Sequence, residues 1–317
     1  MPHTSLTATI HQSYNKSAFP IIRGIVTPVV TPLLDREKLD LASLERLTNR
    51  LIDGGVSALF LLGTTGEFAA MSHELRREFV RATMQLVQDR IPVFTGISDT
   101  SLVESLHLAH CAADAGVAAC VVTAPYYYRP NPVLMGDYLC ELASASPLPL
   151  ILYNMPENTG VNFDLETVKR IIDHPKFIGI KDSGGDLDYF AKLCNLAMVR
   201  HNFSVLMGPD SLLGKAMTLG AAGGVNSGSN LYPEIFVGLY NAYQQGDTAA
   251  MTRFQTKIEL LNRIYAVPQK SLGVPCGLKA ALALLGVCGE YMIPPYRSVC
   301  EQERTAIREL IEQLGLN

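Results

Sequence analysis

The sequence predicts an α/β fold, a (β/α)8 TIM barrel with a C-terminal helical extension, and two observations support it. Apolar runs alternate with longer stretches of helical periodicity, and eight such pairs span about 225 residues, a usual length for a closed barrel. The first run, "GIVTPVVTPLLD", lacks the glycine-rich fingerprint that an open dinucleotide-binding sheet carries after its first strand. We therefore favour the closed barrel over an open doubly wound sheet.

The strands of the predicted barrel are short, nearly continuous apolar runs, which are typical of parallel strands buried on both faces. "FIGIK" and "LPLILYN" are examples. The runs lie at 24–30, 58–63, 92–96, 119–125, 148–154, 177–181, 204–208 and 222–227.

Helical segments separate these strands, and several begin at residues that cap helices well. Asp40 and Ser72 precede amphipathic stretches, and Asp164 opens "DLETVKRII" with acidic residues in the first turn. The helical segments lie near 40–54, 72–89, 101–115, 132–145, 164–173, 186–200, 210–219 and 231–245.

The strand pattern stops after about residue 246, and three helical segments follow, broken by "PQKSLGVP" and "MIPPYR". We therefore expect a barrel at 19–246 and a C-terminal helical domain at 247–317. The polar segment at 1–18, rich in Ser and Thr, is expected to be disordered or loosely ordered. It lacks the apolar core of a secretory signal, and an organelle-targeting leader stays open.

Composition excludes several classes of partner. The 317 residues are 48% hydrophobic with a formal net charge of −4, whereas nucleic-acid surfaces usually carry a basic excess. No apolar run approaches the roughly 18 residues of a membrane span. We therefore expect neither a nucleic-acid partner nor a membrane partner.

The seven cysteines are scattered, odd in number and free of C-x-x-C pairs, a pattern that indicates buried thiols in a reducing, cytoplasmic compartment. His107, His110 and Cys111 lie close together on one helical segment, but we interpret them as the flank of a helix. No metal site is expected.

Unusual polar residues gather at the ends of the predicted strands, where barrels carry their reactive groups. Lys181 ends the buried strand "FIGIK". Burial disfavours an ammonium group, and a neutral amine attacks carbonyls to form a Schiff base, whose iminium allows a neighbouring C–C bond to break or form. The alternative is a lysine whose amine reaches solvent at the rim.

Tyr153 ends the neighbouring strand, so its hydroxyl is expected to reach the same cavity as the amine. A phenol that donates and accepts protons suits the proton transfers of Schiff-base chemistry; a core tyrosine is the alternative.

The motif "GTTGE" (63–67) offers amide groups and hydroxyls in a tight turn, which suits a carboxylate, although an ordinary turn that contains glycines explains it too. Tyr126, Tyr127 and Tyr128 cannot all be core residues, which suggests an interface or a substrate lip.

Taken together, "GTTGE", "APYYYRP", "YNMP", "GIKDSGGD" and "GGVNS", in this order and from about Ile21 onward, resemble the dihydrodipicolinate synthase / N-acetylneuraminate lyase superfamily. The resemblance implies a class I, metal-independent lyase that acts on pyruvate or related 2-oxo acids. It implies no cofactor beyond the covalent Schiff base, and usually a homotetramer built from two tight dimers.

The resemblance also implies residue roles. Lys181 matches the Schiff-base lysine and Tyr153 the proton-shuttling tyrosine. Thr64 matches the threonine that links this tyrosine to a second one, at the position of Tyr127, which the partner subunit contributes across the tight dimer. Thr65 matches the residue that holds the pyruvyl carboxylate.

Four further residues are implied at the substrate site. Gly63 and Gly66 belong to the carboxylate turn, and Asn226 occupies a position whose backbone carbonyl faces the lysine in relatives. Asn158 stands where the synthases carry an arginine that binds a carboxylated aldehyde, and Glu157 precedes it. The chain therefore looks more like 4-hydroxy-2-oxoglutarate and 2-keto-3-deoxy sugar acid aldolases. The synthase itself, a Schiff-base dehydratase of a deoxy sugar acid and a non-catalytic 2-oxo acid sensor stay open.

Overall fold

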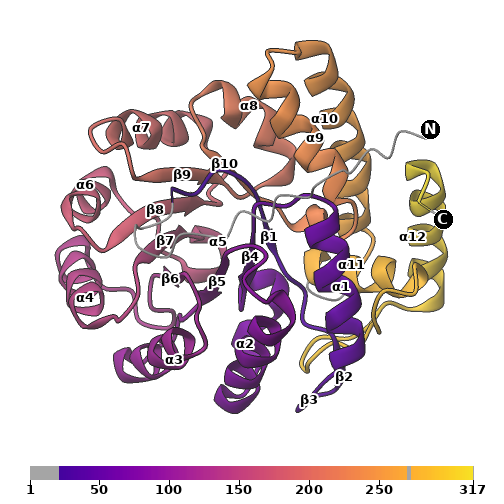
Figure 1. The fold of residues 1–317 in the computed structure, drawn as a ribbon, viewed down its shortest axis with the longest axis horizontal. Helices are drawn as coiled ribbons and strands as arrows, with labels where there is room; N and C mark the ends of the chain where they lie inside the picture. Colours follow the sequence, from indigo (N-terminus) through magenta and orange to yellow (C-terminus); the bar gives the residue numbers. More distant parts are fainter. Residues whose placement is uncertain (1–20, 270–272, 317) are drawn as a thin grey trace, which may run out of the picture.

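The computed structural model describes residues 21–269 and 273–316, and its centre is a closed barrel of eight parallel strands ringed by helices (Figure 1). Around the barrel the strands follow the order β1-β10-β9-β8-β7-β6-β5-β4, so each strand pairs with its neighbours along the chain. The predicted TIM barrel is confirmed. The barrel strands are β1 (Gly24–Pro28), β4 (Ala58–Leu61), β5 (Val93–Gly96), β6 (Ala119–Thr123), β7 (Leu150–Asn154), β8 (Phe177–Asp182), β9 (Ser204–Met207) and β10 (Gly223–Val225).

The helices alternate with these strands and cover the outside of the barrel (Figure 1). They are α1 (Leu41–Asp53), α2 (His73–Val87), α3 (Leu102–Asp114), α4 (Pro132–Ala145), α6 (Leu165–Asp173), α7 (Leu187–Ala197), α8 (Leu213–Thr218) and α9 (Pro233–Gln244).

The predicted caps form as expected. Ser72 Oγ accepts a hydrogen bond from the Leu75 amide (3.2 Å), and Asp164 Oδ1 accepts one from the Thr167 amide (2.6 Å). Each cap satisfies an amide that has no carbonyl partner inside its helix.

A hairpin and a one-turn helix are among the elements that were not predicted. A small hairpin, β2 (Leu33–Asp35) and β3 (Lys38–Leu39), follows the first strand. A one-turn helix, α5 (Pro156–Thr159), follows β7, where proline fits the first helical position and Gly160 ends the turn with a φ of 67°. This helix matters for function, because it carries Glu157 and Asn158 to the rim of the barrel.

Two buried clusters fill the molecule. One lies inside the barrel and includes Val26, Phe60 and Tyr153. The other lies between the strands and the outer helices and includes Ile25 and Leu152. Side chains of one strand alternate between the two clusters, as the two-residue period of a strand requires.

The C-terminal helices are α10 (Thr248–Asn262), α11 (Gly273–Leu284) and α12 (Glu301–Leu314), and the 3-10 helix η5 (Arg263–Ala266) follows α10. They lie together on one side of the barrel (Figure 1). The outer cluster continues without a break from barrel helices into Ile258 and Leu261 of α10. The boundary at 246/247 therefore stays a prediction, and the segment at 1–18 lies outside the described residues. Within 21–269 and 273–316 no helix is long and apolar enough to cross a membrane.

Candidate active site

The pairing of two neighbouring strands brings Lys181 and Tyr153 together. In the parallel register of β7 and β8, Tyr153 pairs directly with Lys181, and Asn154 with Asp182. The register shifts by one residue near the start of the pair, where Phe177 pairs with Leu150 but Gly179 pairs with Ile151. Ile180 consequently packs in the outer cluster, and Lys181 lies beside Tyr153 in the barrel interior.

The amine of Lys181 lies against the aromatic ring of Tyr153. Its Nζ is 4.0 Å from the centre of the Tyr153 ring and 5.5 Å from that of Phe60. Lys181 is 6% exposed and Tyr153 4%. The amine is thus held away from bulk water, next to a phenol and an apolar ring.

The neighbouring groups lower the pKa of Tyr153. Burial alone would raise it, but the charge of Lys181 and hydrogen bonds from Thr64, Lys181 and Ser183 outweigh burial and hold the pKa below its ordinary value. A phenol tuned in this way exchanges protons with its surroundings more readily near neutral pH.

The "GTTGE" turn closes one side of this centre. Its residues 64–66 form the 3-10 helix η1 (Thr64–Gly66), and Thr64 Oγ1 lies 3.3 Å from the Tyr153 hydroxyl, within hydrogen-bond distance. Gly63 lies against the Phe60 ring, where a Cβ atom would come within 2.8 Å of it. The amide of Gly66 donates to the Gly63 carbonyl (3.0 Å), and its carbonyl accepts from Thr31 (2.8 Å).

Thr65 is held by a chain of polar groups that reaches the C-terminal helices. Its hydroxyl lies 2.8 Å from that of Ser227. Buried Asp210 accepts hydrogen bonds from the amides of Ser227 and Gly228 and from the Tyr265 hydroxyl (3.0, 2.9 and 2.7 Å). Burial raises the pKa values of both Asp210 and Tyr265. The orientation of the Thr65 hydroxyl is therefore fixed from outside the barrel.

Asn226 is fully buried, and its described hydrogen bonds join it to Val26 of β1, to Gly208 and Asp210, and to Ser229. Its side chain donates to the Gly208 carbonyl (3.2 Å). Its backbone carbonyl accepts from the hydroxyl of Ser229 (2.6 Å) and from the Ser229 amide (3.3 Å). In this chain the residue serves to order the loop that contains Ser227.

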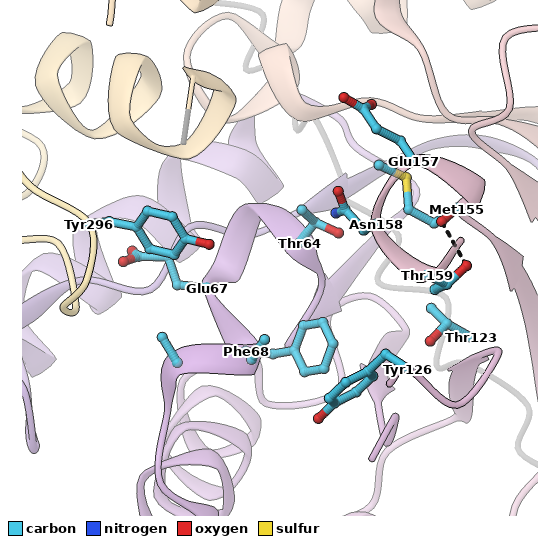
Figure 2. Close-up of a pocket in the computed structure, with 12 residues that line it drawn as sticks. Thr64, Glu67, Phe68, Thr123, Tyr126, Met155, Glu157, Asn158, Thr159 and Tyr296 are labelled. Carbon is cyan, nitrogen blue, oxygen red and sulfur yellow. Dashed lines mark hydrogen bonds between the residues drawn. The ribbon is translucent and has the colours of Figure 1, made fainter. Parts of the chain in front are cut away.

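A pocket of about 410 Å³ opens above this centre, and Figure 2 shows the residues that line it. Thr64 belongs to this lining and also contacts Tyr153, so it joins the pocket to the buried centre. Glu157 and Asn158 stand at the lip on α5, both exposed. Phe68, Tyr126 and Met155 supply apolar wall, and Tyr296 comes from the C-terminal part of the chain.

Tyr127 lies at the surface of the single chain and does not belong to the described lining of the pocket. Its side chain is 86% exposed and stands edge-on to that of Tyr128, with ring centres 5.1 Å apart. Its φ of 88° is unusual for a residue other than glycine. Strain of this kind persists only where the surroundings enforce it.

A second polar group braces the strand ends behind Lys181. Asn154 Nδ2 donates to Asp182 Oδ1 and to Asn162 Oδ1 (2.7 Å each). Burial raises the pKa of Asp182. Because Asn154 and Asp182 follow Tyr153 and Lys181 directly, this contact stabilises the register that pairs Tyr153 with Lys181.

Several residues of the site were not identified from the sequence. Ser227 and Asp210 lie in the rim motifs "GGVNS" and "GPD", yet the chain gives no sign that they share a hydrogen bond. Lys279 stands alone in the apolar helix "GLKAALALLG", a signal of the same kind as Lys181, and it forms a fully buried ion pair with Glu67. Among the residues that the structure describes, no group of three or more His, Cys, Asp or Glu side chains could hold a metal ion. His107 instead lies 3.4 Å from Glu104.

A TIM barrel with a buried lysine beside a tyrosine at the C-terminal ends of its strands defines a class of lyases that work through a Schiff base. Residues 21–314 match the model of the dihydrodipicolinate synthetase family. The chain belongs to this family, and it is a lyase of the aldolase type.

Curated relatives carry two different names. A probable 2-dehydro-3-deoxy-D-pentonate aldolase of Escherichia coli, YjhH, is 31% identical over 92% of this chain and 97% of its own. A 4-hydroxy-tetrahydrodipicolinate synthase of Gluconacetobacter diazotrophicus is 30% identical over 93% of this chain and 98% of its own. Sequence similarity alone therefore leaves the substrate open.

Solved structures agree on the fold. The dihydrodipicolinate synthase of Bacteroides thetaiotaomicron is 42% identical, with a TM-score of 0.90 over 93% of this chain and 99% of its own. YagE, a prophage protein of Escherichia coli K12 whose structure is a complex with pyruvate, is 28% identical, with a TM-score of 0.89 over 94% of this chain and 100% of its own.

Proposed function

We propose that this protein is a class I aldolase that reversibly cleaves a 4-hydroxy-2-oxo acid into pyruvate and an aldehyde. The observation that carries the proposal is the contact between the buried amine of Lys181 and the ring of Tyr153, whose pKa is lowered. Buried amine and tuned phenol are the two groups that Schiff-base chemistry requires. The reaction needs no metal and no cofactor.

The proposed reaction runs through the carbonyl carbon of the substrate. The Lys181 amine attacks C2, water leaves, and an iminium forms. Tyr153 takes the proton of the C4 hydroxyl as the C3–C4 bond breaks, and the electron pair of that bond moves toward the iminium to give an enamine. The aldehyde leaves, C3 gains a proton, and water releases pyruvate and the free amine.

The carboxylate of the substrate is assigned to the "GTTGE" turn. Thr65 holds it through its amide and hydroxyl, and Gly63 and Gly66 let the turn approach closely. The relay from Tyr153 to Thr64 is completed by Tyr127 of a second subunit. The strained, exposed position of Tyr127 supports this, since an interface would stabilise it.

The lip of the pocket favours an uncharged aldehyde partner, which a 2-keto-3-deoxy sugar acid releases, over glyoxylate, which 4-hydroxy-2-oxoglutarate releases. No Lys or Arg belongs to the described lining of the pocket, and Glu157 and Asn158 stand at its edge. A carboxylated aldehyde would lack the cation that a carboxylate prefers, which argues against the synthase reaction. We further propose a homotetramer that works in the cytoplasm.

The first test replaces the nucleophile. Lys181→Arg is expected to abolish turnover, because a guanidinium stays protonated and cannot attack a carbonyl. Pyruvate release is measured from a panel of 4-hydroxy-2-oxo acids and 2-keto-3-deoxy sugar acids. The wild-type protein should be labelled at Lys181 by pyruvate and borohydride, and the variant should not.

Each rival reading predicts a different result. A dehydratase retains the carbon skeleton of a deoxy sugar acid and releases no pyruvate, and a synthase condenses pyruvate with a carboxylated aldehyde. A wild-type protein that pyruvate and borohydride fail to label would contradict the proposal and favour a non-catalytic sensor.

A further inference from the structure

The "GTTGE" turn is tied to the C-terminal part of the chain by a buried ion pair outside the reactive centre. The Glu67 carboxylate pairs with the ammonium of Lys279, which lies on α11, and both side chains are fully buried. Glu67 also accepts a hydrogen bond from the Ile293 amide (2.9 Å), and Lys279 donates to the Tyr291 carbonyl (2.7 Å). In Figure 2 the Glu67 side chain lies on the Tyr296 side of the pocket, away from Asn158.

The backbone makes Glu67 the end point of the turn. Its amide donates to the Thr64 carbonyl (3.1 Å), and its φ of 59° is left-handed. A displacement of Glu67 therefore moves Thr64 and Thr65 with it. The other anchors of the turn, Thr31 and Ser227, belong to the barrel.

A buried ion pair is a poor way to obtain stability alone, because desolvation of the two charges offsets their attraction, and apolar residues of similar size often serve as well. Here the ion pair fixes the position of the Glu67 side chain. A carboxylate held by an ammonium and a backbone amide has one allowed position, whereas an apolar side chain has several.

We infer that Glu67 and Lys279 are positioning residues for the substrate carboxylate, and that α11 with the segment after it is thereby a working part of the active site. This inference rests on the proposed function, in which the turn holds that carboxylate. Glu67 belongs to the lining of the pocket, but its carboxylate is fully buried against Lys279, so we assign the ion pair an indirect role through Thr64 and Thr65.

The test compares two carbonyl compounds. Pyruvate and acetone both form a Schiff base with an amine, but acetone carries a methyl group where pyruvate carries the carboxylate. Each is trapped on Lys181 with borohydride, and the rate of labelling is followed by mass spectrometry. The variant is the double substitution Glu67→Leu with Lys279→Met, which removes both charges and leaves no lone buried ion.

We expect the double variant to lose pyruvate labelling by about tenfold or more, as small displacements of binding groups do, and to keep the wild-type rate with acetone. Equal losses with both compounds, or pyruvate labelling at the wild-type rate, would overturn the inference. If the double variant fails to fold, which circular dichroism reports, Glu67→Asp should show the same selective loss, because it keeps both charges but shortens the side chain that reaches Lys279.

A control removes an ion pair outside this segment of the chain. Arg170→Met breaks the contact of α6 with Asp137 of α4 and should leave both labelling rates unchanged. A wild-type protein that pyruvate does not label overturns the proposed function and this inference with it. If pyruvate labels the wild-type protein but the double variant loses labelling equally with pyruvate and acetone, only this inference is overturned and the proposed function stands.

Discussion

At the scale of single residues, the site depends on the amine of Lys181, which lies against the phenol ring of Tyr153 in a buried region. The field of a nearby ammonium stabilises a phenolate, and the same low polarity that opposes ionisation strengthens this attraction. The Thr64 hydroxyl adds a hydrogen bond to the phenol. Three neighbours, Lys181, Thr64 and Ser183, thus lower the pKa of Tyr153, and each of them can be replaced by mutation.

Thr64→Val is expected to raise the pKa of Tyr153, because the hydrogen bond from Thr64 is one of the contacts that lower it. The limb of the kcat/KM profile that belongs to Tyr153 should then move to higher pH. Steady-state rates across the pH range measure it. Thr64→Ser keeps the hydroxyl and should leave the limb in place.

Tyr153→Phe supplies the reference for that profile. The variant should lose the limb altogether and fall by about 10²–10⁴ in rate, as is usual for a lost acid–base group. A limb that persists in Tyr153→Phe belongs to another group and would contradict the assignment.

At the scale of elements, the register of one strand pair decides whether the site exists. A slip of one residue turns every side chain of a strand to the opposite face. The irregularity between Phe177 and Gly179 sets β8 so that Lys181 points into the barrel. The Asn154–Asp182 hydrogen bond then holds that register at the strand ends.

Helix capping is the element-scale feature that is most open to test. Asp164→Ala should lower the free energy of unfolding by about 0.5–2 kcal/mol, because the Thr167 amide loses its acceptor and the start of α6 loses a favourable negative charge. The midpoint of urea unfolding measures the change. Asp164→Asn keeps the acceptor and should retain most of the stability; an equal loss in both variants would show that the cap is not the cause.

At the scale of the whole molecule, the isolated chain leaves its proposed relay unfinished. Tyr127 and Tyr128 lie almost fully exposed on the loop between β6 and α4, and exposed aromatic pairs of this kind are typical of protein interfaces. One solved relative, 30% identical, is a monomeric dihydrodipicolinate synthase variant. Assembly therefore has to be measured for each member.

Subunit mixing tests whether Tyr127 acts across an interface. Lys181→Arg and Tyr127→Phe should each be strongly impaired alone. A heterodimer of the two should regain activity, because the site with an intact Lys181 receives Tyr127 from its partner. Co-expression with two different tags and sequential purification isolates the heterodimer. Mixed subunits no more active than Tyr127→Phe alone would show that Tyr127 does not act in trans.

The local pattern of the chain was sufficient to predict the barrel and the helix caps, and to single out Lys181 and Tyr153 as candidates for the site. Apolar runs and helical periodicity are properties of short segments, and the five residues "FIGIK" (177–181) are enough to show a lysine at the end of a buried strand. The one-turn helix α5 and the hairpin were missed because turns of this length leave little periodicity.

What the sequence by itself determined about this protein is therefore its elements and their order, and it also singled out Lys181 and Tyr153 as the pair that we propose to be reactive. Only the tertiary structure decided the register that joins this pair, the Asp210 contacts behind Thr65 and the Glu67–Lys279 pair. These contacts join residues up to about two hundred positions apart. A single chain carries no local signal for such contacts, because they arise only when the closing of the barrel brings distant segments together.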